Sequence, residues 1–400
     1  MREEQVINNA KTLIERVQQI PDRRDNRGKR QTLPVVLACV LMAMLSNRSY
    51  MSSIQRYMSH KIEWLKDVFD SPKATAVSRA QLPNILARVD WESLNTVFNA
   101  LFGLCIEQHT GEWKAVDGKS LTGTIVDPAQ AHDHERLVLV VGHTSHDILE
   151  QQRFSGAKES EVTVVRDLLE QTGLVGDKIS FDAGHAYPDT LAPIHAADGI
   201  YVVQIKQNQP QLFTTLVQLA EQVEQEEMES EQAKFPAAGV VISTVDKGHG
   251  RLEERTGRVL SLDPGVLDQR WDPTGMKTVI VMDRRTEDLN TGKTSDERSY
   301  YVSNQPAATH EQDLFDAVRG HWRVESMNWI RDVTFNEDQV RTKDPNTGQI
   351  LSSLRTMALT LLQSLHPKNV KATLEELADT PNALHDLLVR FNLVSTASAS

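Results

Sequence analysis

The sequence predicts an α/β protein with a mixed β-sheet core, a β-rich insertion in that core, and an all-helical domain before it. Three observations support this prediction. Apolar residues recur at helical spacing up to about residue 105, strand-like and helical segments then alternate up to residue 205, and strand-like patterns return at about 235–305. The expected divisions are 1–105, 106–372 and a C-terminal helix with a disordered tail over 373–400.

Composition excludes several broad classes of protein. The chain has 400 residues, of which 40% are apolar and 24% are charged, as in ordinary globular proteins of two or three domains. The longest apolar run, 33–45, is shorter than the roughly 20 residues that cross a bilayer, so a buried helix and no membrane partner are expected. Residues 1–30 lack a secretory signal, and the two cysteines lack a metal or redox spacing, so a cytoplasmic protein is expected.

Charge is unevenly distributed along the chain. A net charge of −12 argues against a nucleic-acid binder that uses its whole surface. The segment 22–30 nevertheless carries five basic residues, Arg23, Arg24, Arg27, Lys29 and Arg30. This segment is either a DNA-contacting arm or a solvated surface. The acidic run 221–231 is interpreted as a solvated helix face.

The N-terminal segment is predicted to form several short helices. Pro34 starts the buried helix, residues 50–69 form the next, and residues 78–102 form two more that separate near Asp90, where Asp90 or Ser93 caps the second. A row of short helices is typical of a helix-turn-helix DNA-binding domain and equally of a dimerisation bundle. The pattern leaves both open.

The core is predicted to begin at Trp113. Strands are expected at 113–116, 137–142, 148–154, 178–181 and 200–205, and helices at 161–171, closed by Gly173, and at 187–197. The first strand is expected to end in a turn at Asp117, and the fourth to end at Asp182.

The insertion follows a helix over 211–231. Its strands are expected at 239–245, 255–262, 278–284 and 298–303, with hairpin turns at 246–248 and 290–292. Helices are then expected at 310–335, 350–365 and 373–391, before a disordered tail at 395–400.

Three carboxylates stand out as candidate site residues. Taken singly, Asp117 and Asp182 are most simply turn or capping residues, but ligands of open α/β sheets bind beyond strand ends, so the two together suggest a site. The helical spacing puts Glu325 between Trp322 and Trp329 on the apolar face. There it needs a cation or an ion-pair partner, which could be Arg323, Arg331 or a residue of a neighbouring domain. Such an oxygen-only set suits Mg²⁺ or Mn²⁺. The two tryptophans are expected in the core.

Histidines could instead suggest zinc. His132, His134, His143 and His146 fall close together in the sequence without cysteine support. Surface histidines are therefore expected there.

Six motifs in order carry a family resemblance. They are 115–120 (AVDGKS), Lys158 with Glu161, 179–183 (ISFDA), 205–209 (IKQNQ), 249–255 (HGRLEER) and the long block 319–338 with its two tryptophans. Over nearly all its length the chain resembles DDE-class insertion-sequence transposases of the H-repeat-associated type (ISAs group).

The resemblance implies an RNase H-like core with Asp117, Asp182 and Glu325 as the catalytic and metal-binding triad. It implies a DNA transposase that uses Mg²⁺ (or Mn²⁺) to cut the ends of its element and to transfer the 3′-hydroxyl ends to target DNA. The implied partners are double-stranded DNA, as terminal inverted repeats and target, and a second copy of the chain in a homodimer. The implied location is the bacterial cytoplasm, at the nucleoid.

DNA contacts are expected from basic residues of these segments. They are Arg23, Arg24, Arg27, Lys29, Arg30, Lys119, Lys158, Lys206, His249, Arg251, Arg255, Arg319 and His321.

The sequence departs from the family pattern close to the triad. Ser326, Met327 and Asn328 precede Trp329, where the family has Asn-x-Leu-His-Trp after the glutamate. His321 and Asp332 stand where a related signature has arginine and lysine. Two alternatives remain: a stand-alone metal-dependent nuclease, and an inactive retained copy that acts as a DNA-binding protein.

Overall fold

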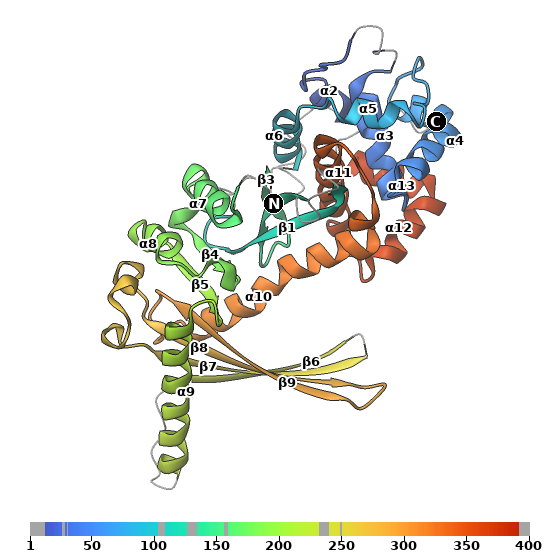
Figure 1. Ribbon diagram of the computed structural model, residues 1–400. Helices are drawn as coiled ribbons and strands as arrows, with labels where there is room; N and C mark the ends of the chain where they lie inside the picture. The colour runs from blue at the N-terminus through green and yellow to red at the C-terminus, as the bar shows by residue number, and fades with distance from the viewer. Residues whose placement is uncertain are drawn as a thin grey trace.

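The architecture comes from a computed structural model. It describes residues 13–25, 29, 31–102, 109–125, 134–155, 159–231, 240–248 and 250–391 (Figure 1). In this part of the chain, a nine-stranded sheet lies between helical layers. The helices from the two ends of the chain pack together beside the half of the sheet that contains β1 to β3.

The N-terminal helices form as predicted. Their bounds are α2 Leu13–Val17, α3 Leu33–Leu45, α4 Met51–Val68, α5 Gln81–Leu86 and α6 Trp91–Phe102. All 13 residues of α3 are buried, which confirms that its apolar run is a core helix. No helix in the described ranges combines the length and apolar character needed to span a bilayer. Asp90 caps α6, since its Oδ2 accepts from the Ser93 backbone N–H at 3.1 Å.

The C-terminal helices belong to the same core as the N-terminal ones. Their bounds are α11 Pro345–Gln363, α12 Val370–Asp379 and α13 Pro381–Arg390. Apolar residues of α3 to α6 and of α11 to α13 form one continuous buried cluster with one face of the sheet. The single helix expected over 373–391 was wrong. Pro381 has no backbone N–H to continue α12 and instead begins α13.

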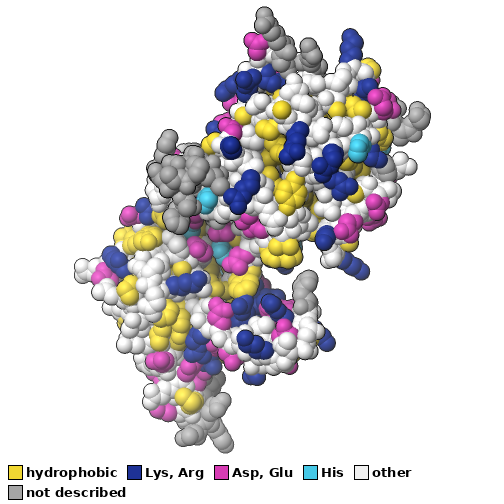
Figure 2. All heavy atoms as spheres, turned by 45° about the vertical axis from the view of Figure 1, so that its right-hand side comes forward, with side chains coloured by type: hydrophobic (Ala, Val, Ile, Leu, Met, Phe, Trp, Pro, Cys, Tyr) yellow, Lys and Arg dark blue, Asp and Glu magenta, His cyan; other side chains and the backbone are white. Residues whose placement is uncertain are grey.

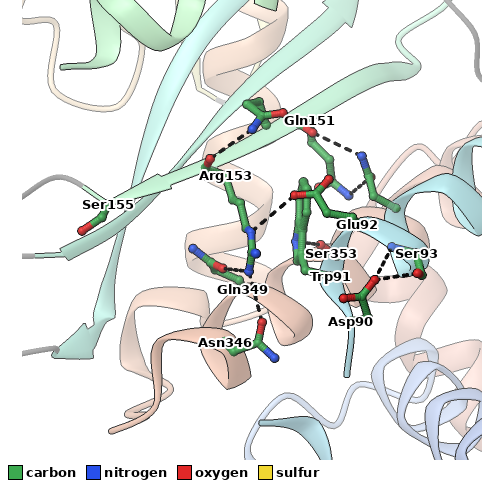
Figure 3. A network of polar contacts seen from close by, with 12 residues as sticks. Asp90, Trp91, Glu92, Ser93, Gln151, Arg153, Ser155, Asn346, Gln349 and Ser353 are labelled. Carbon is green, nitrogen blue, oxygen red and sulfur yellow. Dashed lines mark hydrogen bonds and ion pairs between the residues drawn. The ribbon is translucent and has the colours of Figure 1, made fainter. Parts of the chain in front are cut away.

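Polar contacts join α6, β3 (Ile148–Ser155) and α11 (Figure 3). The Trp91 indole N–H donates to Ser353 Oγ at 2.9 Å, and the Arg153 guanidinium donates to Gln349 and Asn346 at 2.9 and 3.2 Å. The same guanidinium lies 5.2 Å from the centre of the Trp91 indole ring. The N-terminal helices are therefore fixed to the sheet by directional contacts as well as by apolar packing.

The sheet has the strand order β3-β2-β1-β4-β5-β9-β8-β7-β6. The other strands are β1 Trp113–Ile125, β2 His134–Gly142, β4 Lys178–Phe181, β5 Ile200–Ile205, β6 Val240–Gly248, β7 Arg251–Ser261, β8 Thr278–Asp288 and β9 Thr294–Ser303. One face packs on α7 Glu161–Thr172, α8 Pro188–Ala196 and α9 Pro210–Glu231. The other face packs on α10 Glu311–Trp329 and α11.

The insertion continues this sheet instead of forming a separate one. β9 pairs antiparallel with β5, and β6 to β9 extend away from the body below α10 (Figure 1). The predicted turn at 290–292 is confirmed, with Gly292 at φ +68°. The turn expected at 246–248 was wrong, because those residues pair with β7 through Gly248 and Arg251, and the reversal follows at Gly250 with φ +74°.

Candidate active site

Asp117 lies inside β1, not in the turn that the sequence suggested. It pairs with Leu139 of β2, and that long antiparallel pairing keeps β1 extended to Ile125. The parallel partner β4 stops earlier, because the last β1–β4 pair is Val116 with Phe181. The next residues of the two strands are Asp117 and Asp182, so the register brings the two aspartates to the same point of the sheet.

Asp182 follows β4 at its carboxyl end, as predicted. Its Oδ1 accepts from the Gly184 backbone N–H at 2.9 Å, which caps the short 3-10 helix that follows, and about half of its side chain is exposed. Ser180, two residues earlier, contacts His321 of α10, so strand alternation turns Asp182 toward α10 as well.

Asp117 is fixed by α10. Asn328 donates from Nδ2 to Asp117 Oδ2 at 3.1 Å. Sequence reasoning missed this contact, although Asn328 lies three residues after Glu325 and therefore on the same side of the helix. The sequence did mark Asn328 in one way, because it is one of the residues after Glu325 that differ from the family pattern.

Glu325 is exposed, which corrects the expectation that it lies buried between two core tryptophans. Trp322 is 38% exposed and Trp329 is 60% exposed. The C-terminal half of α10 packs instead through His321, Val324 and Met327, because those positions face the sheet and the helices behind it. One of the partners suggested for Glu325, Arg331, is buried and bonded to Glu337 at 2.9 Å.

The carboxylates of this region repel one another. Burial, followed by the charges of Asp182, Glu161 and Glu325, raises the pKa of Asp117 to about 7. Partial desolvation by the surrounding chain also raises the pKa of Glu325, although the residue is largely exposed, while Lys206 and Arg284 oppose that shift. The charges of four carboxylates therefore interact near the carboxyl end of β4, in the middle of the sheet.

A divalent cation fits this place in charge and in ligand type. The donors are carboxylate oxygens, the ligands that Mg²⁺ and Mn²⁺ prefer, and a cation would relieve the repulsion that raises the pKa of Asp117. Within the described residues, however, no three His, Cys, Asp or Glu side chains are close enough to hold one ion together.

Two histidines support the sheet behind these carboxylates. The Ser180 hydroxyl lies 2.9 Å from His143 Nε2 and 3.0 Å from His321 Nδ1, and both rings are buried. Burial lowers the pKa of His143 to about 3 and that of His321 to about 4, so both rings are neutral near pH 7. The surface position expected for His143 was wrong, and His321 is enclosed instead of facing a DNA strand.

The basic residues predicted to contact DNA have different environments. Arg24 and Lys119 are buried and bonded to Asp22 and Asp332, respectively, which removes them from the surface. Arg23 pairs with Asp90, and Arg255 and Arg319 both pair with Asp246. Lys29, Lys206 and Arg251 are exposed. The remaining four, Arg27, Arg30, Lys158 and His249, lie outside the described residues.

A cleft of about 760 Å³ separates α10 from the insertion. Its walls include Trp322 and Arg323 of α10 and Arg284 and Arg255 of the insertion. The Arg284 guanidinium lies 4.3 Å from the centre of the Trp322 ring, so the two walls touch there. Figure 2 shows the molecule hollowed between its two lobes, with Lys and Arg side chains on the projecting part.

Both the helical N-terminal segment and the sheet-containing part of the chain match models of known protein families. Residues 14–102 match the family model described as DDE_Tnp_1-associated, and residues 115–361 match the Transposase DDE domain. The "Putative transposase YncI" of Escherichia coli O157:H7 is 25% identical over 88% of this chain and 87% of its own length. The "H repeat-associated putative transposase YhhI" of E. coli K12 is 24% identical over 88% and 90%, respectively.

Proposed function

The chain belongs to the transposase DDE domain family, and from this premise we propose that it cuts DNA at the ends of an insertion sequence and transfers the freed 3′-hydroxyl ends to target DNA. The observation that carries the proposal is the β1–β4 register. It brings Asp117 and Asp182 together on the side of the sheet that faces α10, the helix of Glu325. The mixed sheet with helices on both faces supports an RNase H-like core.

The proposed triad is Asp117, Asp182 and Glu325, which would hold Mg²⁺ or Mn²⁺. The metal would activate a water or a 3′-hydroxyl and stabilise the leaving oxygen. Asn328 orients Asp117 by its hydrogen bond to Oδ2. The neutral pair His143 and His321 anchors β4 to α10 through Ser180, which fixes Asp182 relative to Glu325.

We place the DNA in the cleft between α10 and the insertion. Phosphates require cationic side chains, and the cleft is lined by Arg255, Arg284, Arg319 and Arg323. A phosphate would replace Asp246 or Glu297 as the partner of the first three. Lys206 lies close enough to Glu325 to oppose its pKa shift, so it is the proposed contact to a phosphate near the reacting bond. The remaining exposed candidates are Arg23, Lys29 and Arg251.

The proposed partners are double-stranded DNA, in the form of terminal inverted repeats and target, and a second copy of the chain. A homodimer would bring two element ends together. Light scattering of the protein with and without end DNA tests the dimer.

Cleavage of end-labelled DNA from the segments that flank the gene tests the proposed function. Wild type, Glu325→Gln and the control Glu311→Gln, at the first residue of the same helix, are compared with Mg²⁺, with Mn²⁺ and with chelator. We expect cuts at matched inverted sequences that need metal and Glu325 and that survive in the control.

The alternatives give different results in this assay. Metal-dependent cuts without joining to a second duplex would indicate a stand-alone nuclease. Tight binding to the ends with no cut under any condition would indicate a retained copy that only binds DNA. Either result would contradict the proposed transposase activity.

A further inference from the structure

Glu161 lies outside the proposed triad, yet its charge acts on Asp117. It is the first residue of α7, on the opposite side of the sheet from α10, and it reaches Gly118, the residue after Asp117. A Cβ at position 118 would lie 2.0 Å from Glu161 Oε2, so the carboxylate fills the space that a side chain would need. Its charge contributes to the raised pKa of Asp117.

His185 lies between Glu161 and Asp182. The His185 side chain is 1% exposed, and its Nε2 lies 3.4 Å from Glu161 Oε1 and 4.0 Å from Asp182 Oδ1. Neither ring nitrogen has a hydrogen-bond partner of good geometry in the described part of the chain. A polar ring buried in this way is costly unless the groups around it complete its bonding, so its position between two carboxylates points to a site that closes around a ligand.

The alternative interpretation is a helix-end role. An acidic residue in the first turn stabilises a helix by its interaction with the macrodipole. That role needs neither a glycine at 118 nor a buried histidine against the carboxylate. The two contacts favour a role in the site.

We propose that Glu161 is a fourth carboxylate of the divalent-ion site, separated from Asp182 by the buried ring of His185 and given its space by Gly118. The inference rests on the proposed function. Glu161 approaches from α7 and Glu325 from α10, so the ion site would be enclosed from both sides of the sheet at the end of β4. The Lys-x-x-Glu motif thereby gains a chemical role through its glutamate.

Titration of the full chain with Mn²⁺ tests the inference without relying on turnover. Electron paramagnetic resonance of the free ion measures the binding. The variants are Glu161→Gln, the matched control Glu170→Gln at an exposed site of the same helix, and Asp182→Asn. We expect Glu161→Gln to weaken Mn²⁺ binding about 10-fold or more and Glu170→Gln to leave it unchanged. Binding equal to wild type in Glu161→Gln would overturn the inference.

Gly118→Ala provides a second variant that displaces the Glu161 carboxylate without removing it. We expect it to weaken Mn²⁺ binding as well, and the double variant Gly118→Ala/Glu161→Gln to be no weaker than the worse single one. Additive losses would mean that position 118 acts independently of Glu161 and would contradict the proposed contact.

The failure of the inference is distinguishable from failure of the proposed function. Loss of Mn²⁺ binding in Asp182→Asn but not in Glu161→Gln leaves the triad in place and removes Glu161. If wild type binds no Mn²⁺ and shows no metal-dependent cleavage, both fail. A lower melting temperature of Glu161→Gln with unchanged Mn²⁺ affinity would assign Glu161 to the helix end alone.

Discussion

At the scale of single residues, the environment of Asp117 is set by three other carboxylates and by its burial. In the folded chain the pKa of Asp117 is about 7, against an ordinary value of 3.8. Between these two pH values the folded chain binds a proton that the unfolded chain has released. The free energy of unfolding therefore falls as pH rises through this range when no metal is bound.

Asp117→Asn should remove this pH dependence. We expect the variant to melt about 2–4 °C above wild type at pH 8 in chelator and by a smaller margin at pH 5, because most of the loss of wild-type stability falls between these pH values while the amide stays neutral at both. Thermal melts across this range measure the difference, with Asp167→Asn, exposed on α7, as control. A variant that gains no stability between pH 5 and pH 8 would contradict the repulsion.

Asp182→Asn tests the chemistry at the second aspartate. Cutting should fall below detection because a neutral amide is a poor ligand for Mg²⁺, while the free energy of unfolding changes by less than about 0.5 kcal/mol. The amide oxygen can still accept from Gly184, so the cap of the 3-10 helix is kept. Cleavage, chemical denaturation and DNA-binding assays measure the three properties, and unaltered cutting would refute the role of Asp182.

Sequence motifs alone put forward the proposed triad, but they did not predict its surroundings. Asp182 follows a strand, and strand ends are recognisable from apolar runs. The contact of Asn328 with Asp117 depends on the rotation of α10, and α10 has two possible apolar stripes. The stripe through Trp322 and Trp329 was the wrong one, because the stripe through Val324 and Met327 carries the packing.

At the scale of elements, the turn after α10 is held by a buried ionic cluster. Residues 330–334 form a π-helical turn, and Arg331 bonds to Glu337 at 2.9 and 3.1 Å, with Arg355 of α11 at 3.4 Å from the same carboxylate. The two guanidinium groups hold the pKa of Glu337 down at about 2. This cluster fixes the end of α10 and therefore the position of Glu325 and Asn328.

Glu337→Gln should destabilise the protein strongly. Two buried guanidinium groups would lose their counter-charge, which costs about 3–5 kcal/mol of unfolding free energy. Urea denaturation of the variant against Glu375→Gln, an exposed change on α12, measures the loss. A loss below 1 kcal/mol would mean that water or Asp332 replaces the pairing.

The insertion offers a prediction about DNA at the same scale. Arg251 is exposed at the β6–β7 end of the insertion, whereas Lys277 is exposed at the opposite end, before β8. If Arg251 contacts a phosphate, Arg251→Ala should flatten the slope of log affinity against log salt by about 1, and Lys277→Ala should not change it. Equal slopes for the two variants would remove the hairpin from the DNA interface.

At the scale of the whole molecule, the helical segment before residue 105 is part of the body that holds the sheet. The sequence predicts it as a separate domain, because periodicity shows helices but not what they pack against. In the structure α3 is buried on all sides by helices from both ends of the chain, and Asn346 of α11 donates to the carbonyls of Leu86, Ala87 and Val89. A DNA-binding or dimerisation role for these helices stays a prediction, and such a role would use their outer surface.

A shared core predicts one cooperative unit. We expect calorimetry of the full chain to show α2 to α6 unfolding together with the sheet body, and a chain of residues 106–400 to lack a cooperative transition, because the surface that α3 covers on α11 to α13 would be exposed. A chain that lacks only residues 395–400 is the control. If residues 106–400 instead unfold cooperatively and bind Mn²⁺ as the full chain does, the helices before residue 105 are a separable domain, and the position of the active site does not depend on them.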